Sequence, residues 1–169
     1  MQNIEIKARY EDFTHARRCV AELGGKFAEI LEQTDVYFHV PEGRLKLRHI
    51  KGQAANLIFY RRDDRPEVRK SEYDIYRTDN PNELERVLGK AYGELARVVK
   101  HRELLLINNV RVHLDTVDQL GTFIEFEAVL QPAKDPQLEA EKLEHYLSKF
   151  KIKPQQLLAH SYLDLLLAL

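Results

Sequence analysis

Cysteine is almost missing from this sequence, because Cys19 is the only one in 169 residues. A single cysteine excludes an intramolecular disulfide, and a reducing, cytoplasmic compartment is the simplest setting for such a chain. Cys19 stands beside Val20 and Leu23 at helical spacing. We therefore expect a small buried side chain at this position rather than a catalytic thiol.

Long apolar runs are also missing. The opening segment MQNIEIKARY is charged from its fifth residue onward and lacks the apolar centre of a signal peptide. The apolar segment LDLLLAL near the end is far shorter than the roughly 20 residues that a membrane-spanning helix requires. We therefore expect no membrane partner.

Charge of one sign is not in excess either, since the formal net charge is −1. Such a chain has no global attraction for nucleic acid, and we expect no nucleic-acid partner; any polyanion site has to be local. Hydrophobic residues make up 44% and charged residues 31%, a composition typical of a soluble globular protein. The length, without internal repeats or a long linker, predicts a single domain over residues 1–169.

Alternation of polar and apolar residues predicts β-strands over much of the chain. Between Asn3 and Arg9, for example, Ile4 and Ile6 share one face while Glu5 and the other polar residues share the opposite face. The same pattern, bounded by turn residues, predicts further strands. The predicted strands are 3–9, 35–40, 44–50, 56–62, 70–77, 98–107, 110–117 and 121–130.

Helical spacing of apolar residues predicts helices before, between and after these strands. The first precedes the pair Gly24-Gly25, and the second begins at Asn80-Pro81, where proline suits the first turn. A loop bracketed by Pro132 and Pro136 comes before a third, amphipathic helix that reaches Phe150. Residues 154–169 predict one or two short apolar helices.

Charged residues recur on one face of several predicted strands. For any one strand, the simpler interpretation is the solvated face of an antiparallel sheet. For the whole set we favour a curled sheet whose charged face lines the interior while the apolar helices cover the outside. The sequence thus predicts the α+β class, with an antiparallel eight-stranded β-barrel and helices packed outside. The charged face comprises Glu5, Lys7, Arg44, Lys46, Arg48, Lys100, Arg102, Arg111, His113, Asp115, Glu125 and Glu127.

Enclosed charges must be compensated, and this set suggests how. Arginine forks match phosphate oxygens, lysine adds compact positive charge, and carboxylates are hard oxygen ligands for magnesium or manganese. A polyphosphate together with a divalent metal would satisfy both kinds of group.

Six motifs follow one another over nearly the whole chain: NIEIKA, QTDVYF, GRLKLR, RKSEY, VRVHLDTVDQLGTFIEFE and HSYLDLL. In this order they resemble the motifs of the CYTH superfamily, and NIEIKA resembles its ExExK strand. This superfamily includes class IV adenylate cyclases, thiamine triphosphatases and inorganic triphosphatases. The pattern is most similar to the class IV cyclase-like branch.

The resemblance implies a barrel with a charged triphosphate tunnel, Mg²⁺ or Mn²⁺ as cofactor, and a small-molecule triphosphate as substrate. It implies that Glu5 and Lys7 are catalytic, and it is compatible with a homodimer. Metal-associated residues would be Glu5, Asp115, Glu125 and Glu127. Phosphate would contact Lys7, Lys46, Arg48, Lys100, Arg102 and Arg111.

Three functions stay open at this point. The first is conversion of ATP to cyclic AMP and pyrophosphate. The second is hydrolysis of thiamine triphosphate, tripolyphosphate or a nucleoside triphosphate, and the third is noncatalytic polyphosphate binding. Asn3 motivates the third, because it replaces the first glutamate of ExExK and offers a metal only a neutral oxygen.

Single residues also keep alternative interpretations. Asp115 suits a local turn as well as a metal, and His113 is an ordinary hydrogen-bonded histidine in the simpler interpretation. Arg61 and Arg62 are adjacent, so only one of them can face the interior of a regular strand.

Overall fold

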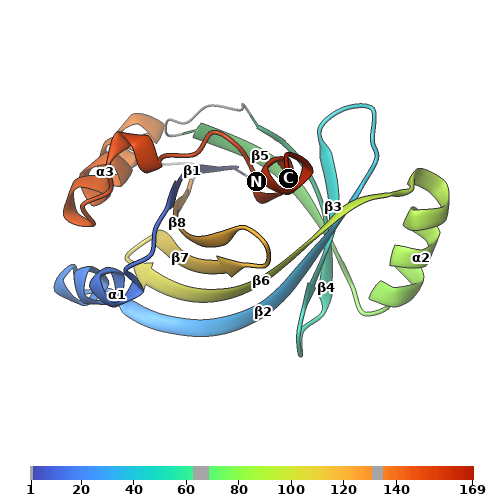
Figure 1. Cartoon of the computed structure of the whole chain (residues 1–169), viewed down its shortest axis with the longest axis horizontal. Helices are drawn as coiled ribbons and strands as arrows, with labels where there is room; N and C mark the ends of the chain where they lie inside the picture. Colours follow the sequence, from blue (N-terminus) through green and yellow to red (C-terminus); the bar gives the residue numbers. More distant parts are fainter. Residues whose placement is uncertain (1, 63–68, 131–134) are drawn as a thin grey trace.

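The computed structural model describes residues 2–62, 69–130 and 135–169 (Figure 1). The polar segment 63–68 and the expected loop residue Pro132 lie outside the described residues. The strands are β1 (Gln2–Arg9), β2 (Lys26–Phe38), β3 (Arg44–Ile50), β4 (Ala55–Arg62), β5 (Arg69–Thr78), β6 (Glu94–Ile107), β7 (Val110–Val117) and β8 (Gly121–Val129). The helices are α1 (Phe13–Glu22), α2 (Pro81–Tyr92), α3 (Pro136–Lys149), the short 3-10 helix η1 (Pro154–Gln156) and α4 (Tyr162–Leu167).

These strands form one closed antiparallel barrel in the order β1-β5-β4-β3-β2-β6-β7-β8. β1 closes it, since β1 pairs with β5 on one side and with β8 on the other. In that second pairing Lys7 stands opposite Glu125. The predicted eight-stranded antiparallel barrel with outer helices is confirmed.

β2 begins nine residues earlier than predicted, at Lys26 rather than at residue 35. Its first part is exposed, with Phe27 and Ile30 both more than half accessible. A register shift between Phe27 and Glu29 also interrupts the pairing with β6. Pairing with β6, and not burial of an apolar face, stabilises this part of the strand. Its sequence therefore lacks the polar-apolar alternation of a half-buried strand.

The turn from α1 into β2 depends on a close backbone approach. A Cβ atom on Gly25 would lie 2.6 Å from the Leu106 carbonyl oxygen on β6. The preceding residue, Gly24, has a φ of 73°, a backbone angle that residues with a side chain rarely adopt. The predicted glycine stop therefore also allows β2 to start directly against β6.

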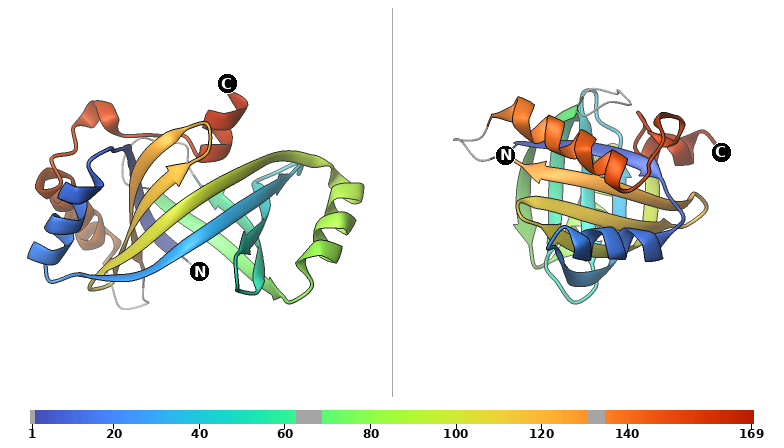
Figure 2. Two further views of the ribbon diagram at one scale, coloured as in Figure 1. Left: turned by 60° about the horizontal axis from the view of Figure 1, so that its bottom comes forward. Right: turned by 90° about the vertical axis from the view of Figure 1, so that its left-hand side faces the viewer.

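Two groups of helices cover the outside of the barrel, as Figures 1 and 2 show. α1 and α3 lie on one side and α2 on the opposite side. Phe126 of β8 is fully buried under α3, with its ring 4.9 Å from that of Phe150 and 5.9 Å from that of Tyr146. On the opposite side, Leu88 of α2 packs with Val36 of β2. Burial of these apolar outer faces leaves the opposite faces of the strands for the interior.

Candidate functional site

The interior of the barrel contains a cavity of about 390 Å³. Every strand contributes to its lining, and so does α4 through Ser161 and Tyr162. All of the predicted site residues line this cavity except Asp115, which is fully buried beside it. The charged strand faces therefore meet inside the barrel and do not form an outer solvated surface. The charged and amide lining residues are Asn3, Glu5, Lys7, Glu29, Gln33, Lys46, Arg48, Lys100, Arg102, Arg111, Glu125 and Glu127.

Arg44 was predicted as a member of the charged face but does not line the cavity, and neither does Arg61. Arg44, at the start of β3, has its Nη2 3.0 Å from both carboxylate oxygens of Asp164 in α4. Arg61 is exposed, with Nη2 2.8 Å from Glu42. The side chain of Arg62 lies outside the described residues.

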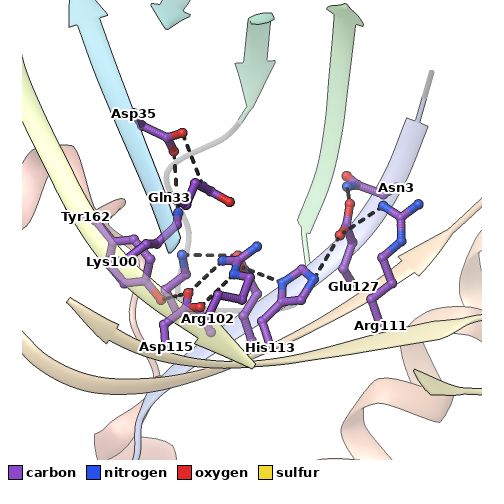
Figure 3. A network of polar contacts seen from close by, with 12 residues as sticks. Asn3, Gln33, Asp35, Lys100, Arg102, Arg111, His113, Asp115, Glu127 and Tyr162 are labelled. Carbon is purple, nitrogen blue, oxygen red and sulfur yellow. Dashed lines mark hydrogen bonds and ion pairs between the residues drawn. The ribbon is translucent and has the colours of Figure 1, made fainter. Parts of the chain in front are cut away.

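The two ends of the cavity differ. Near α4, a buried cluster that includes Tyr37, Tyr60, Phe123 and Tyr162 fills the barrel. Elsewhere the lining includes the exposed residues Glu29, Ile75 and Arg111, which mark its opening to solvent. In Figure 3, Tyr162 and Asp115 lie on one side of the polar network, while Asn3, Glu127 and Arg111 lie on the other.

Glu125 is the meeting point of β1, β6, β7 and β8. Its carboxylate lies 3.1 Å from Lys7 Nζ, 3.1 Å from Arg102 Nη2 and 3.3 Å from His113 Nδ1. Burial alone would raise the pKa of Glu125, but Lys7, His113 and Arg102 hold this pKa well below its usual range. Glu125 is therefore ionised in the folded protein.

Asp115 forms the tightest pair in the cavity wall. Both of its oxygens lie 2.6 Å from the Arg102 guanidinium, and the Tyr162 hydroxyl donates a hydrogen bond to Oδ2 at 2.7 Å. Burial raises the pKa of this carboxyl, but Arg102 and Lys100 lower the pKa by more than burial raises it. The pKa of Asp115 therefore lies below its usual range. With both oxygens occupied, Asp115 serves here to hold Arg102 and Tyr162 in place.

Asn3 and Glu127 face each other between β1 and β8. The Asn3 amide donates a hydrogen bond to Glu127 Oε1, and Arg111 Nη1 lies 3.5 Å from Glu127 Oε2. His113 Nε2 lies 3.7 Å from the same oxygen. The Asn3 Oδ1 atom is buried and has no hydrogen-bond partner among the described residues. A neutral oxygen acceptor thus lies beside a carboxylate in the cavity wall.

Asp35 on β2 is the third buried carboxylate of this site, after Glu125 and Asp115. Arg48 Nε lies 2.8 Å from its Oδ1, and Lys46 Nζ and Lys100 Nζ lie 3.2 Å and 3.4 Å from Oδ2. Burial lowers the pKa of Lys46 to about 8 and that of Lys100 to about 7, although Asp35 opposes both shifts. Three of the predicted phosphate-binding cations therefore share one internal carboxylate.

Residues 1–162 match the CYTH domain family. The chain belongs to the CYTH family.

Individual CYTH relatives resemble the whole chain. A protein of Methanocaldococcus jannaschii named "Putative adenylate cyclase MJ0240" is 24% identical over an alignment of 174 positions, which covers 98% of this chain and 98% of that protein. The PH1012 protein of Pyrococcus horikoshii OT3 is 26% identical and has a TM-score of 0.82, covering 96% of this chain and 98% of that one. A structure from Vibrio parahaemolyticus described as "a putative adenylate cyclase" has a TM-score of 0.81, 18% identity and 97% coverage of both chains; this likeness shows the fold alone.

The CYTH fold brings the predicted acidic residues together only in part. Glu5, Glu125 and Glu127 line one cavity. The Asn3 oxygen, which accepts no hydrogen bond from the described residues, adds a neutral oxygen ligand of the kind that binds hard divalent cations. In the described ranges, however, no group of three or more acidic, histidine or cysteine side chains is arranged to hold a metal ion. Glu125 in particular is surrounded by Lys7, Arg102 and His113. Metal binding would therefore require some of these cations to turn toward another anion.

Sequence reasoning left three members of this CYTH site unassigned: Asp35, Tyr162 and His113. Asp35 lies in QTDVYF, where Gln33, Asp35 and Tyr37 occupy alternate positions and share the inner face of β2. That spacing was a usable signal, as it was for the other strands. Tyr162 gave no such signal, because its role depends on where α4 docks against the barrel.

No helix in the described part of the chain is both long and apolar enough to cross a bilayer.

Proposed function

We propose that this CYTH protein is a metal-dependent enzyme that processes an organic triphosphate, with ATP converted to cyclic AMP and pyrophosphate. The observation that carries the proposal is the convergence of six predicted phosphate-binding cations on one cavity that is also lined by four glutamates, three of them predicted metal ligands. The likeness to a relative named as a cyclase, over the full length of both proteins, supports this choice of reaction.

Lys46 and Arg48 would bind the phosphates from β3, and Lys100 and Arg102 would bind them from β6. Lys7 on β1 and Arg111 on β7 would complete this set of cations. Glu5, Glu127 and Glu125, with the free oxygen of Asn3, would hold Mg²⁺ or Mn²⁺. The metal would neutralise phosphate charge and act as a Lewis acid. Glu5 and Lys7 on β1 remain the proposed catalytic residues.

In the proposed reaction, the ribose 3′ oxygen forms a bond to the α phosphorus, and the bond from that phosphorus to the pyrophosphate oxygen breaks. The proton of the 3′ hydroxyl is released with the pyrophosphate to solvent, so that atoms and charge balance. The chain contributes by holding the triphosphate among cations that four strands keep in place, since such positioning supplies much of the rate in phosphoryl transfer.

A product assay tests this proposal. The purified protein is incubated with ATP, thiamine triphosphate or tripolyphosphate and with Mg²⁺ or Mn²⁺, and both cyclic AMP and orthophosphate are measured. Cyclic AMP without orthophosphate supports the cyclase. Orthophosphate without cyclic AMP assigns the hydrolase instead, binding without turnover assigns a polyphosphate-binding protein, and absence of both binding and turnover removes the proposal.

The metal role has its own test. Glu127→Gln keeps the size of the side chain and its contact with the Asn3 amide group but removes the charge. We expect metal-dependent turnover to fall about 100-fold, the loss typical of a missing metal contact. Turnover equal to that of the unsubstituted protein at limiting Mn²⁺ would remove Glu127 from the proposed metal set.

A further inference from the structure

Asp35 sits where an anion-binding site would hold its ligand. The Arg48 guanidinium grips both carboxylate oxygens, with Nε 2.8 Å from Oδ1 and Nη2 3.0 Å from Oδ2. Lys46 and Lys100 approach Oδ2 from the neighbouring strands, and Gln33 Nε2 donates to Oδ1 at 3.2 Å. An arginine fork, two ammonium groups and an amide are the donors that a phosphate group would receive. Here the protein's own carboxylate receives them.

This carboxylate cannot leave its position easily. Asp35 is 1% exposed and lies on β2 between β3 and β6, so its short side chain is fixed by two paired strands. The three cations, by contrast, have long side chains that all line the cavity. A phosphate group would therefore meet the open sides of these cations while Asp35 stays behind them.

The balance of charge distinguishes this cluster from an ordinary ion pair. Outside the barrel, Arg17 is the one cation paired with Glu103 among the residues that the structure describes, through contacts of 2.6 Å and 2.9 Å. Asp35 faces three cations, so the cluster keeps a net positive charge directed at the cavity. A carboxylate serving only to neutralise a buried cation would need one partner and not three.

We propose that Asp35 is a positioning residue of the triphosphate site: it fixes the geometry of Lys46, Arg48 and Lys100 and offsets one of their three charges. The proposal rests on the proposed function. It implies that the protein binds its polyanion more weakly than the three cations alone would allow, and that it gains a fixed arrangement of donors in return.

Asp35→Asn separates these two effects. The variant loses one negative charge beside the ligand, so we expect inorganic tripolyphosphate to bind about tenfold more tightly or better in calorimetry with metal removed. The same variant loses the fixed donor geometry, so kcat should fall about tenfold or more while KM also falls. Asp35→Glu retains the charge and should return KM toward the original value. A purely structural role would not move kcat and KM in this pattern.

Glu103→Gln is the matched control, because it removes a carboxylate from an arginine pair outside the barrel. Its affinity for tripolyphosphate should stay unchanged. If Asp35→Asn unfolds without ligand, tripolyphosphate should restore its folded circular dichroism spectrum by supplying the missing negative charge, and failure to restore it overturns the proposal. Equal tripolyphosphate affinity of Asp35→Asn and the unsubstituted protein also overturns it, with the proposed function intact. No binding to either protein overturns both.

Discussion

At the scale of single residues, Asn3 shows how one change alters the balance of a charged cavity. Its amide donates to Glu127, where a glutamate in the family's motif would place a second carboxylate. We predict that Asn3→Glu lowers the free energy of unfolding by about 1–2 kcal/mol without metal, because two carboxylates would then repel each other. Added Mn²⁺ should stabilise the variant more than the unsubstituted protein. Thermal unfolding with EDTA and with Mn²⁺ measures both effects.

Asn3→Gln provides the control for size, since it has the length of glutamate without its charge. It should show no additional stabilisation by Mn²⁺. If Asn3→Glu and Asn3→Gln respond equally to Mn²⁺, a negative charge at residue 3 does not contribute to metal binding.

The two buried lysines make ligand binding depend on pH. In the folded protein, burial lowers the pKa of Lys100 to about 7 and that of Lys46 to about 8. Both values lie below the unfolded value, so the unfolded chain binds more protons over this range and stability rises as pH increases from about 7 to about 10. A bound polyanion favours the charged lysines and raises both pKa values.

We therefore predict that tripolyphosphate binding takes up protons at about pH 8 and much less at about pH 6, where both lysines are already charged. Calorimetry in two buffers of different ionisation enthalpy measures this uptake. Lys100→Met should reduce it at the higher pH. Binding heats that do not depend on the buffer at about pH 8 would show that these lysines do not change charge.

At the scale of elements, α4 connects the outside of the barrel with its interior. Ser161 caps the helix in a reciprocal arrangement with Asp164, and Asp164 also pairs with Arg44 at the start of β3. This anchorage places the Tyr162 ring 3.8 Å from Lys7 Nζ and its hydroxyl on Asp115. A helix of six residues thus closes one end of the cavity.

We predict that Tyr162→Phe costs about 1–3 kcal/mol, because the hydroxyl is buried and donates to an ionised carboxylate. Urea unfolding measures the loss. Tyr76→Phe is the matched control, since Tyr76 is 65% exposed and its change should be close to zero. A Tyr162→Phe value as small as that of the control would show that Arg102 alone satisfies Asp115.

The strands were easier to predict than their lengths. β7 was predicted at residues 110–117 and has these bounds, because apolar and polar residues alternate from Val110 to Asp115 in a short segment that is paired on both sides. β2 was predicted too short, because its first part depends on pairing with β6 and not on its own pattern. For the same reason the contacts of Asp35, which join three strands, could not be read from any one strand. The alternation of polar and apolar residues predicts which side chains face the interior. The ion-pair partners of each charged residue depend on the register between neighbouring strands, which the sequence does not show.

At the scale of the whole molecule, apolar packing and ligand chemistry lie on opposite faces of the same sheet. Phe126 faces α3 from β8, while its neighbours Glu125 and Glu127 face the cavity. We predict that Phe126→Ala lowers the free energy of unfolding by about 3–5 kcal/mol through the cavity it creates. The tripolyphosphate affinity of the folded fraction should change little.

Phe27→Ala is the comparison for this prediction, because Phe27 is 56% exposed and its removal should alter stability by less than about 0.5 kcal/mol. Urea unfolding and calorimetry on the same samples give both quantities. A large loss of affinity in folded Phe126→Ala would mean that the outer packing determines the inner geometry.

The closing role of β1 bears on how the protein is made. β1 spans Gln2–Arg9, yet one of its two partners is β8, which ends at Val129. During synthesis β1 therefore emerges long before β8. The edge of β1 that pairs with β8 stays unpaired until more than a hundred further residues have been added. Contacts of such sequence separation form slowly, and the sheet cannot close before β8 has been synthesised. Because polar residues alternate with apolar ones along β1, the unpaired strand is less prone to aggregate than a continuous apolar strand would be.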